Sequence, residues 1–243
     1  MKIIPVIDIL NGIAVHAVKG KRSEYKPLQS NLIKSTDPQE IAEVLYRLGF
    51  KELYIADLDA IIDCSSNFDQ LKKIVEKINV ALMVDAGVTS LERAYQLLEK
   101  GVARIVIGTE TLSSKNFIVD MLKRFGRKRI LVSLDLKDGK VLVQPSFSGP
   151  VEPIHLLKEF KSLGLSEVIV LDLSRVGSRE GVDFDFLKKI IEETGFDIYI
   201  GGGVRDLKDL NDLKKIGVVG VLIGTSLHTG KISIEELKGE GLF

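Results

Sequence analysis

Residues 82–110 read LMVDAGVTSLERAYQLLEKGVARIVIGTE, and residues 198–226 read IYIGGGVRDLKDLNDLKKIGVVGVLIGTS. The two stretches align without a gap, which places Gly87 on Gly203 and Thr109 on Thr225. Each stretch contains an apolar run, a glycine turn, a helical pattern, a second apolar run and Gly-Thr. A repeat of this kind indicates that one structural unit is used twice in the chain.

The repeat extends upstream of these stretches. IIPVIDILNGIAV matches ILVSLDLKDGKVL and places Asp8 on Asp135, while ELYIADLDA matches EVIVLDLSR and places Asp57 on Asp172. We therefore interpret the chain as two similar halves, about 1–126 and 127–243, which together form a single domain.

Eight short apolar runs alternate with longer helical patterns. The runs are continuous and lack polar alternation, so both faces of each strand should be buried, as in a parallel sheet covered by helices. Eight such units in two similar halves predict a (β/α)8 TIM barrel, whereas a doubly wound open sheet would not need matching halves. The predicted strands are 3–8, 52–57, 81–85, 103–107, 129–135, 167–172, 197–201 and 219–223.

Composition narrows the class of protein. The net charge is zero and no basic block stands out, so nucleic acid is not an expected partner. No apolar run approaches the roughly 20 residues of a membrane span, so no membrane association is expected. The single cysteine, Cys64, excludes an internal disulfide and favours a cytoplasmic location. No cluster of His, Cys and carboxylate residues has the spacing of metal ligands, so no metal is expected.

Glycine turns after the strands predict anion binding. Backbone N–H groups in such turns can hold a phosphate, and the turns after the last two strands are the usual phosphate location in this fold. Asp85 stands where the second half has a glycine, and its carboxylate would repel phosphate, so the first-half copy is the weaker prediction. The predicted phosphate-binding residues are Gly202, Gly203, Gly224 and Thr225, with Gly87, Gly108 and Thr109 in the first half.

Four aspartates end apolar strands and should lie near the mouth of the barrel. Two carboxylates facing each other across a pocket can act as general acid and base. We assign these roles to Asp8 and Asp135 as a prediction, and we expect Asp57 and Asp172 to cap loops or pair with nearby lysines. Two long connections, 17–35 and 136–151, follow the first and fifth strands, and the second should contain a hairpin turned at Asp138-Gly139.

The motifs taken together resemble those of the histidine-biosynthesis barrels. This family includes phosphoribosylformimino-5-aminoimidazole carboxamide ribotide isomerase and the cyclase subunit of imidazole glycerol phosphate synthase. The resemblance implies a half-barrel duplication, a small substrate with a phosphate at each end, catalytic roles for Asp8 and Asp135, and, for the isomerase, an Amadori rearrangement without a cofactor. It also implies a binding role for Ser178. The matching motifs are PVIDILNG, LYIADLDA, VIGT, SLDLKDGKV, LDLSRVGS, IGGGVRDL and VLIGTSL.

The chain departs from the family pattern in its functional loops. The second catalytic aspartate of the isomerase lies in a sequence like S-R-D-G-T, which in this chain reads SRVGS with Val176 in its place. The first-half G-G-G-I-R turn becomes DAGVT at 85–89, the tryptophan of the loop after strand five is absent, and His16 replaces the lysine of the cyclase. These changes indicate a divergent paralogue.

Two classes of function follow. The first is an enzyme acting on a phosphorylated sugar or ribonucleotide-like substrate, as an aldose–ketose isomerase of the Amadori type or in a related acid–base reaction. The alternative is a phosphometabolite-binding paralogue that has lost isomerase activity. The aspartates Asp8 and Asp135 favour the enzyme, whereas Val176 and Asp85 favour the binding protein. A partner protein is not predicted from the sequence.

Overall fold

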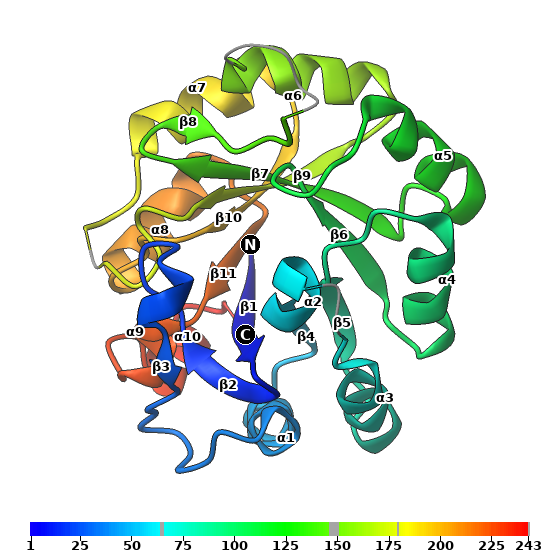
Figure 1. The fold of residues 1–243 in the computed structure, drawn as a ribbon. Helices are drawn as coiled ribbons and strands as arrows, with labels where there is room; N and C mark the ends of the chain where they lie inside the picture. Colours follow the sequence, from blue (N-terminus) through cyan, green and yellow to red (C-terminus); the bar gives the residue numbers. More distant parts are fainter. Residues whose placement is uncertain (64–65, 146–150, 179, 243) are drawn as a thin grey trace.

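The computed structural model describes residues 1–63, 66–145, 151–178 and 180–242. Cys64 lies outside these residues. Within them, eight parallel strands form a closed barrel that helices surround (Figure 1), because the last strand pairs with the first through Lys2 and Gly220. The predicted (β/α)8 TIM barrel is thereby confirmed.

Each of the eight barrel strands overlaps a predicted strand. Around the barrel, every strand pairs in parallel with the barrel strands that precede and follow it in the sequence. The strands are β1 (Lys2–Leu10), β4 (Glu52–Asp57), β5 (Ala81–Asp85), β6 (Arg104–Gly108), β7 (Ile130–Lys137), β9 (Glu167–Asp172), β10 (Asp197–Gly201) and β11 (Gly220–Ile223).

The helices that alternate with the barrel strands occupy the predicted helical stretches. Asp37, Ser90 and Asp206 cap three of them by accepting hydrogen bonds from backbone amides of the first turn, which accounts for the helix starts. The helices are α1 (Pro38–Leu48), α3 (Phe68–Lys77), α4 (Leu91–Glu99), α5 (Lys115–Phe125), α6 (Pro153–Ser162), α7 (Phe184–Thr194), α8 (Leu207–Lys215) and α10 (Ile234–Gly239).

A short hairpin follows the first strand of each half. β8 (Lys140–Val141) pairs antiparallel with β7 across Asp138-Gly139, where both residues have positive φ, as predicted. β2 (Ile13–His16) pairs with β1 across Asn11-Gly12 in the same way and continues into β3 (Lys26–Pro27). The first hairpin was not predicted, although its turn occupies the position equivalent to Asp138-Gly139.

Two short helices were also not predicted. α2 (Leu58–Asp63) follows β4 directly, and α9 (Thr225–His228) follows β11. Both lie in loops at the carboxyl ends of the strands, and Figure 1 shows α2 over that end of the barrel. α2 therefore lies where it can restrict access to the barrel mouth.

Strand alternation divides the apolar residues into two layers. One set packs between the strands and the helices, and the other fills the barrel, where Tyr54, Met83 and Val106 belong to one buried cluster. At the amino-terminal end of the barrel the Arg104 guanidinium pairs with Glu167, and the Tyr199 hydroxyl donates to the same carboxylate at 3.0 Å. The interior is closed at that end, so a ligand enters from the carboxyl ends of the strands.

Candidate active site

Three aspartates reach the barrel interior at the carboxyl ends of their strands. Asp8 lies on β1, Asp85 on β5 and Asp135 on β7, and all three line one cavity. Three strands separate β1 from β7 on either side of the barrel, so Asp8 and Asp135 lie on opposite walls. Asp85 lies between them, on the wall opposite β10.

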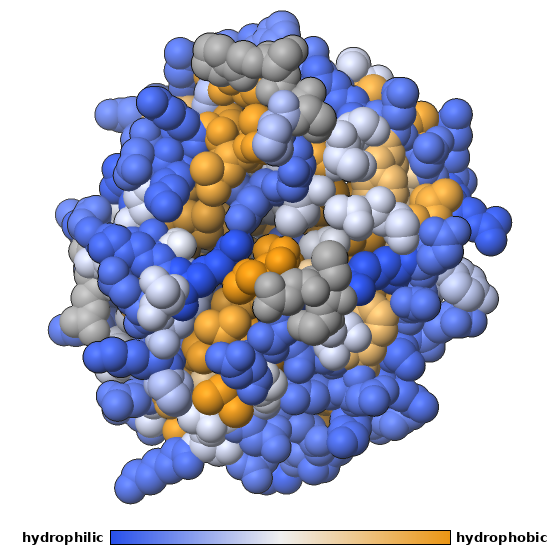
Figure 2. All heavy atoms as spheres, viewed as in Figure 1, coloured by the Kyte–Doolittle hydropathy of each residue, from blue (hydrophilic) through white to orange (hydrophobic). Residues whose placement is uncertain are grey.

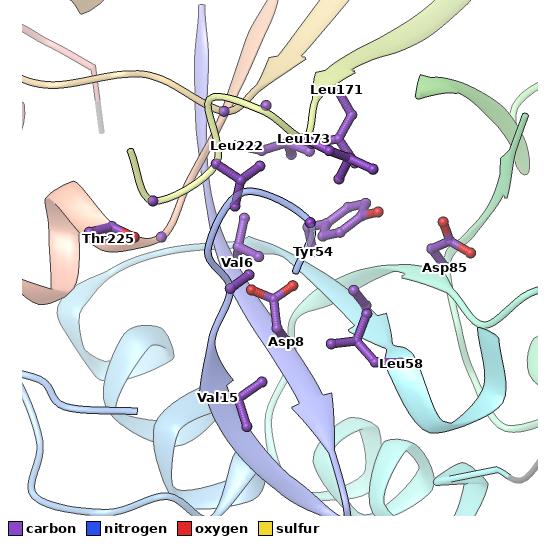
Figure 3. Close-up of a pocket in the computed structure, with 18 of the residues that line it drawn as sticks. Val6, Asp8, Val15, Tyr54, Leu58, Asp85, Leu171, Leu173, Leu222 and Thr225 are labelled. Atoms are coloured by element: carbon purple, nitrogen blue, oxygen red, sulfur yellow. The ribbon is translucent and has the colours of Figure 1, made fainter. Parts of the chain in front are cut away.

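The cavity has a volume of about 450 Å³ and a mostly apolar wall. Figure 2 shows hydrophobic residues gathered near the middle of this face of the molecule. In Figure 3, Asp8 points into the cavity among apolar side chains, with Thr225 and Asp85 at opposite ends of the view. The apolar lining includes Val6, Val15, Leu58, Ile61, Leu142, Leu171, Leu173, Val176 and Leu222.

The Asp8 carboxylate accepts no hydrogen bond from any described residue. Its side chain is partly open to the cavity, where Val6 and Val15 lie nearby (Figure 3). Burial disfavours the ionised form and raises the pKa of Asp8 to about 7. A carboxyl group with such a pKa exchanges protons readily at neutral pH.

Asp135 is held more firmly. Its Oδ1 accepts a hydrogen bond from the Ser133 hydroxyl at 2.7 Å, and its Oδ2 accepts one from the Glu110 amide at 3.2 Å. Burial raises the pKa of Asp135 to about 7, although both hydrogen bonds lower it. The side chain is therefore oriented and still titrates near neutrality.

Asp85 is the carboxylate that lies next to Asp135. A Cβ atom at Gly108 would lie 2.7 Å from Oδ2 of Asp135 and 3.3 Å from Oδ2 of Asp85, so both carboxylates converge on that glycine. Burial, and then the charge of Asp135, raise the pKa of Asp85 to about 8. Sequence reasoning treated Asp85 only as a residue that repels phosphate and missed this proximity.

Tyr54 adds a hydroxyl group that sequence reasoning missed. The residue is only 3% exposed and lines the cavity, and its hydroxyl makes no hydrogen bond with a described residue. Figure 3 shows its ring directed toward Asp85. Burial and the charges of Asp85, Asp135 and Asp8 raise its pKa well above the ordinary value. Tyr54 therefore stays protonated and presents a hydrogen-bonding group to a ligand.

A second cavity of about 420 Å³ adjoins the first at the β10 and β11 end. Gly203, Thr225 and Ser226 line both cavities, and Arg175, Arg205 and Lys231 contribute positive charge to the second. The two arginines are paired with Asp172 and Asp209, whereas Lys231 makes no ion pair with a described residue. This end of the site can hold an anion.

Glycine is required in the turn that separates the two cavities. Gly202 and Gly203 have φ angles of 93° and 86°, which other residues rarely adopt. A Cβ atom would lie 2.5 Å from the Asp172 carbonyl oxygen at Gly202 and 2.4 Å from that of Gly181 at Gly203. The turn therefore packs directly against the loop after β9.

The structure places the eight predicted phosphate-binding residues differently. Gly202, Gly203, Gly224 and Thr225 line the main cavity, and Gly108 lines it between two carboxylates. Gly87, Thr109 and Ser178 line neither cavity. The Ser178 hydroxyl instead donates to the Arg175 carbonyl within its own loop.

The other two strand-end aspartates point away from the interior. Asp57 is fully buried and accepts hydrogen bonds from the Ala60 amide and from the amide and side chain of Asn67. Asp172 pairs with Arg175 at 3.0 Å. Both therefore have the loop-supporting role that the sequence indicated.

The long first connection contacts loops of both halves over the cavity. Arg22, in the short η1 helix (Arg22–Glu24), bonds to Glu110 of the loop after β6 at 2.8 Å. The Lys19 amide donates to the Val176 carbonyl at 2.8 Å. The long first connection thus crosses the mouth, and Val176 lies in the cavity wall where the family pattern has a carboxylate.

Clusters of metal-ligand residues and membrane-spanning helices were both sought in the part of the chain that the structure describes. No group of three or more His, Cys, Asp and Glu residues there could hold a metal ion. No helix in those residues is long and apolar enough to cross a membrane.

The fold and the site together define a (β/α)8 barrel in which three aspartates and a glycine turn line one cavity at the carboxyl ends of the strands. The family model for histidine biosynthesis proteins matches residues 2–233, so the chain belongs to that family.

Three relatives illustrate the similarity. An uncharacterized protein of Methanocaldococcus jannaschii, MJ0703, is 39% identical over 244 residues, which cover 98% of this chain and 97% of the relative. The 1-(5-phosphoribosyl)-5-((5-phosphoribosylamino)methylideneamino)imidazole-4-carboxamide isomerase of the same organism is 32% identical over 238 residues, or 97% of each chain. The isomerase of Prochlorococcus marinus strain MIT 9515 is 34% identical over 241 residues, covering 97% of this chain and 92% of its own.

Proposed function

We propose that the protein is an aldose–ketose isomerase of the Amadori type that acts on a phosphorylated sugar or sugar amine. The observation that carries this proposal is the position of Asp8 and Asp135 on opposite walls of one cavity, which adjoins an anion-binding end. Membership of a family that includes isomerases supports it. The proposal includes a cytoplasmic location, which the single cysteine favours.

The reaction needs one acid and one base. The acid protonates the ring oxygen of the aminoaldose, so the ring opens and leaves a C1=N iminium group. The base then removes the proton from C2, and the electron pair of that C–H bond forms the C1–C2 double bond of an enolamine. When C1 gains a proton and the C2 hydroxyl loses one, the product is an aminoketose.

We assign the base to Asp135 and the acid to Asp8. The hydrogen bonds from Ser133 and Glu110 favour the ionised form of Asp135, whereas Asp8 accepts none and is favoured as the neutral form. The anion-binding end around Gly203 and Thr225 would anchor the substrate phosphate and so position the ring between the two groups.

One observation favours the alternative of a binding protein without catalysis. Val176 lines the cavity in the place of the family carboxylate, and valine transfers no proton. In addition, Methanocaldococcus jannaschii has both a relative named as the isomerase and a second relative, more similar to this chain, that is not so named. A paralogue can therefore coexist with an isomerase in one organism.

The test is a pH profile with two variants. The wild type should turn over a phosphorylated aminoaldose with a bell-shaped kcat/KM profile, because an ionised Asp135 and a protonated Asp8 are needed together. In the pH profile of the residual kcat/KM, Asp135→Asn should remove the rise on the acidic side, and Asp8→Asn should remove the fall on the alkaline side. If the protein turns over no phosphorylated aminoaldose but still binds phosphate, the binding-protein alternative holds instead.

A further inference from the structure

The repeat-related amides differ in their hydrogen bonds. The amides of Gly203 and Thr225 donate to no described residue and adjoin the cavities. Their first-half equivalents are both occupied, because the Thr109 amide donates to the Ser133 carbonyl at 2.9 Å and the Gly87 amide donates to Oδ1 of Asp85 at 3.2 Å. Only the second-half pair is available to an anion.

The first-half turn is also covered. A Cβ atom at Gly87 would lie 3.0 Å from Cα of Ile61, so the backbone of α2 packs directly on this turn. Thr109 is fully buried, and its hydroxyl accepts a hydrogen bond from the Asp135 amide at 3.0 Å. A phosphate at this end would have to displace α2 and break these contacts.

Asp85 and Tyr54 face the cavity at this end and can accept hydrogen bonds, while the nearby Arg22 guanidinium is already paired with Glu110 at 2.8 Å. Asp85 is 7% exposed, and its Oδ2 makes no hydrogen bond with a described residue. The unpartnered Tyr54 hydroxyl lies in the same part of the cavity, and Figure 3 shows both residues on the side away from Thr225. Buried carboxylates require donor partners, so this end suits a hydroxyl or an amine and opposes a phosphate.

We propose that the ligand is a phosphomonoester that carries a single phosphate. The phosphate binds at the Gly203 and Thr225 end of the cavity. At Asp85 and Tyr54 the ligand presents a hydroxyl or an amine, which donates a hydrogen bond and carries no negative charge. This inference rests on the proposed phosphate anchor and departs from a substrate with a phosphate at each end.

The electrostatics of the cavity agree with this assignment. A second phosphate near Asp85 would add negative charge to a buried group of carboxylates that already resist ionisation, since burial raises the pKa of Asp85 to about 8. An ammonium group at the same place would favour the ionised form. An amine ligand should therefore release protons from the protein when it binds near neutral pH.

The experiment is isothermal titration calorimetry with inorganic phosphate and three matched probes: glucose 6-phosphate, glucosamine 6-phosphate and glucose 1,6-bisphosphate. We expect at least one monophosphate to bind tenfold or more tightly than the bisphosphate, a ratio that corresponds to about 1.4 kcal/mol. If glucosamine 6-phosphate binds more tightly than glucose 6-phosphate and its binding releases protons, the group at Asp85 is an amine. If glucose 6-phosphate binds more tightly, the group is a hydroxyl. Equal or tighter binding of the bisphosphate would overturn the inference, as would binding of inorganic phosphate without either monophosphate.

Two variants separate this inference from the proposed function. Asp85→Asn should reduce the preference for monophosphate over bisphosphate severalfold, whereas Asp197→Asn, at an exposed position at the start of β10, should leave it unchanged. Lys231→Ala should weaken all phosphate ligands alike, with exposed Lys214→Ala as its control. If inorganic phosphate fails to bind, the anchor and the proposed function fail together. If phosphate binds but Asp85→Asn leaves the preference unchanged, only the present inference fails.

Discussion

At the scale of single residues, strand alternation decides which acids reach the ligand. Successive side chains of a strand point to opposite faces, so Asp8 shares the interior face of β1 with Ile4 and Val6. Asp57 is one residue beyond the interior position Ala56, and it points outward into the α2 loop. The four strand-end aspartates therefore have two different roles, which their register in the barrel determines.

The first residue-scale prediction concerns Asp8. Asp8→Asn should lower turnover by about 10²–10⁴-fold, the usual contribution of a positioned acid or base. The measurement is steady-state turnover, with phosphate affinity as a check on the integrity of the site. Asp197→Asn is the matched control because that aspartate is exposed at the other end of the barrel. A variant within a few-fold of the wild type would remove Asp8 from the mechanism.

The second residue-scale prediction concerns Val176. Wild-type turnover of the histidine-pathway substrate should be weak, and Val176→Asp should increase it, because the new carboxylate enters the cavity wall. The gain should be partial, since misplaced groups cost on the order of 10²-fold. Turnover by each variant is compared in one assay. Wild-type rates in the ordinary range of roughly 1–10³ per second would show that Val176 is no defect.

Sequence reasoning found the site residues that the repeat marks and missed those that depend on three-dimensional proximity. Asp8 and Asp135 were identified because they occupy equivalent positions in the two halves. The proximity of Asp85 to Asp135 depends on Gly108 of the intervening strand, and the position of Tyr54 depends on strand register. Nothing in the local sequence reports either contact. The catalytic roles themselves stay predictions.

At the scale of elements, the barrel strands and long helices follow from periodicity, and the short elements do not. α9 has only four residues, and α2 begins directly after the last residue of β4, so neither is set off as a helical pattern of its own. Yet α2 covers the first-half glycine turn, so an element that periodicity does not reveal closes one end of the site. The β1–β2 hairpin was not predicted, although the alignment of the two halves places its Asn11-Gly12 turn on Asp138-Gly139.

An element-scale prediction concerns the anchor of α2. Asp57→Ala should lower the free energy of unfolding by roughly 1.5–3 kcal/mol, the range for hydrogen bonds to a charged group, because it leaves the Ala60 and Asn67 donors without their acceptor. Urea denaturation measures the effect. Asp183→Ala, which removes the exposed cap of α7, is the control and should cost about 1 kcal/mol. An Asp57→Ala effect below that of the control would contradict this role.

At the scale of the whole molecule, the barrel is nearly two-fold symmetric in its elements and asymmetric in its site. Both halves begin with a strand and a hairpin, which supports our proposal that 1–126 and 127–243 are duplicated halves of one domain. The strand ends diverge, with Asp85 on β5 opposite Gly201 of β10. The first half therefore supplies Asp8 and Asp85, whereas the second half supplies Asp135 and the glycine turn that we propose to bind the anion.

A whole-molecule prediction concerns stability and pH. The pKa values of Asp8, Asp85 and Asp135 are raised to about 7, 8 and 7, so between about pH 4 and pH 8 the folded state binds more protons than the unfolded state. These groups therefore make stability fall as pH rises through that window. Asp85→Asn should stabilise the protein more at pH 8 than at pH 5, by on the order of a few kcal/mol, because one proton separates the two states over this range at about 1.4 kcal/mol per pH unit. Equal effects at both pH values in urea denaturation would contradict this.

The most direct test of the central claim, a cavity with its anion at one end only, is a crystal structure of the protein grown with inorganic phosphate. We expect a phosphate at the turn formed by Gly202, Gly203, Gly224 and Thr225, within hydrogen-bonding distance of the Gly203 and Thr225 amides. We expect no phosphate beside Asp85. A phosphate found only beside Asp85, with the Gly203 turn empty, would contradict the account.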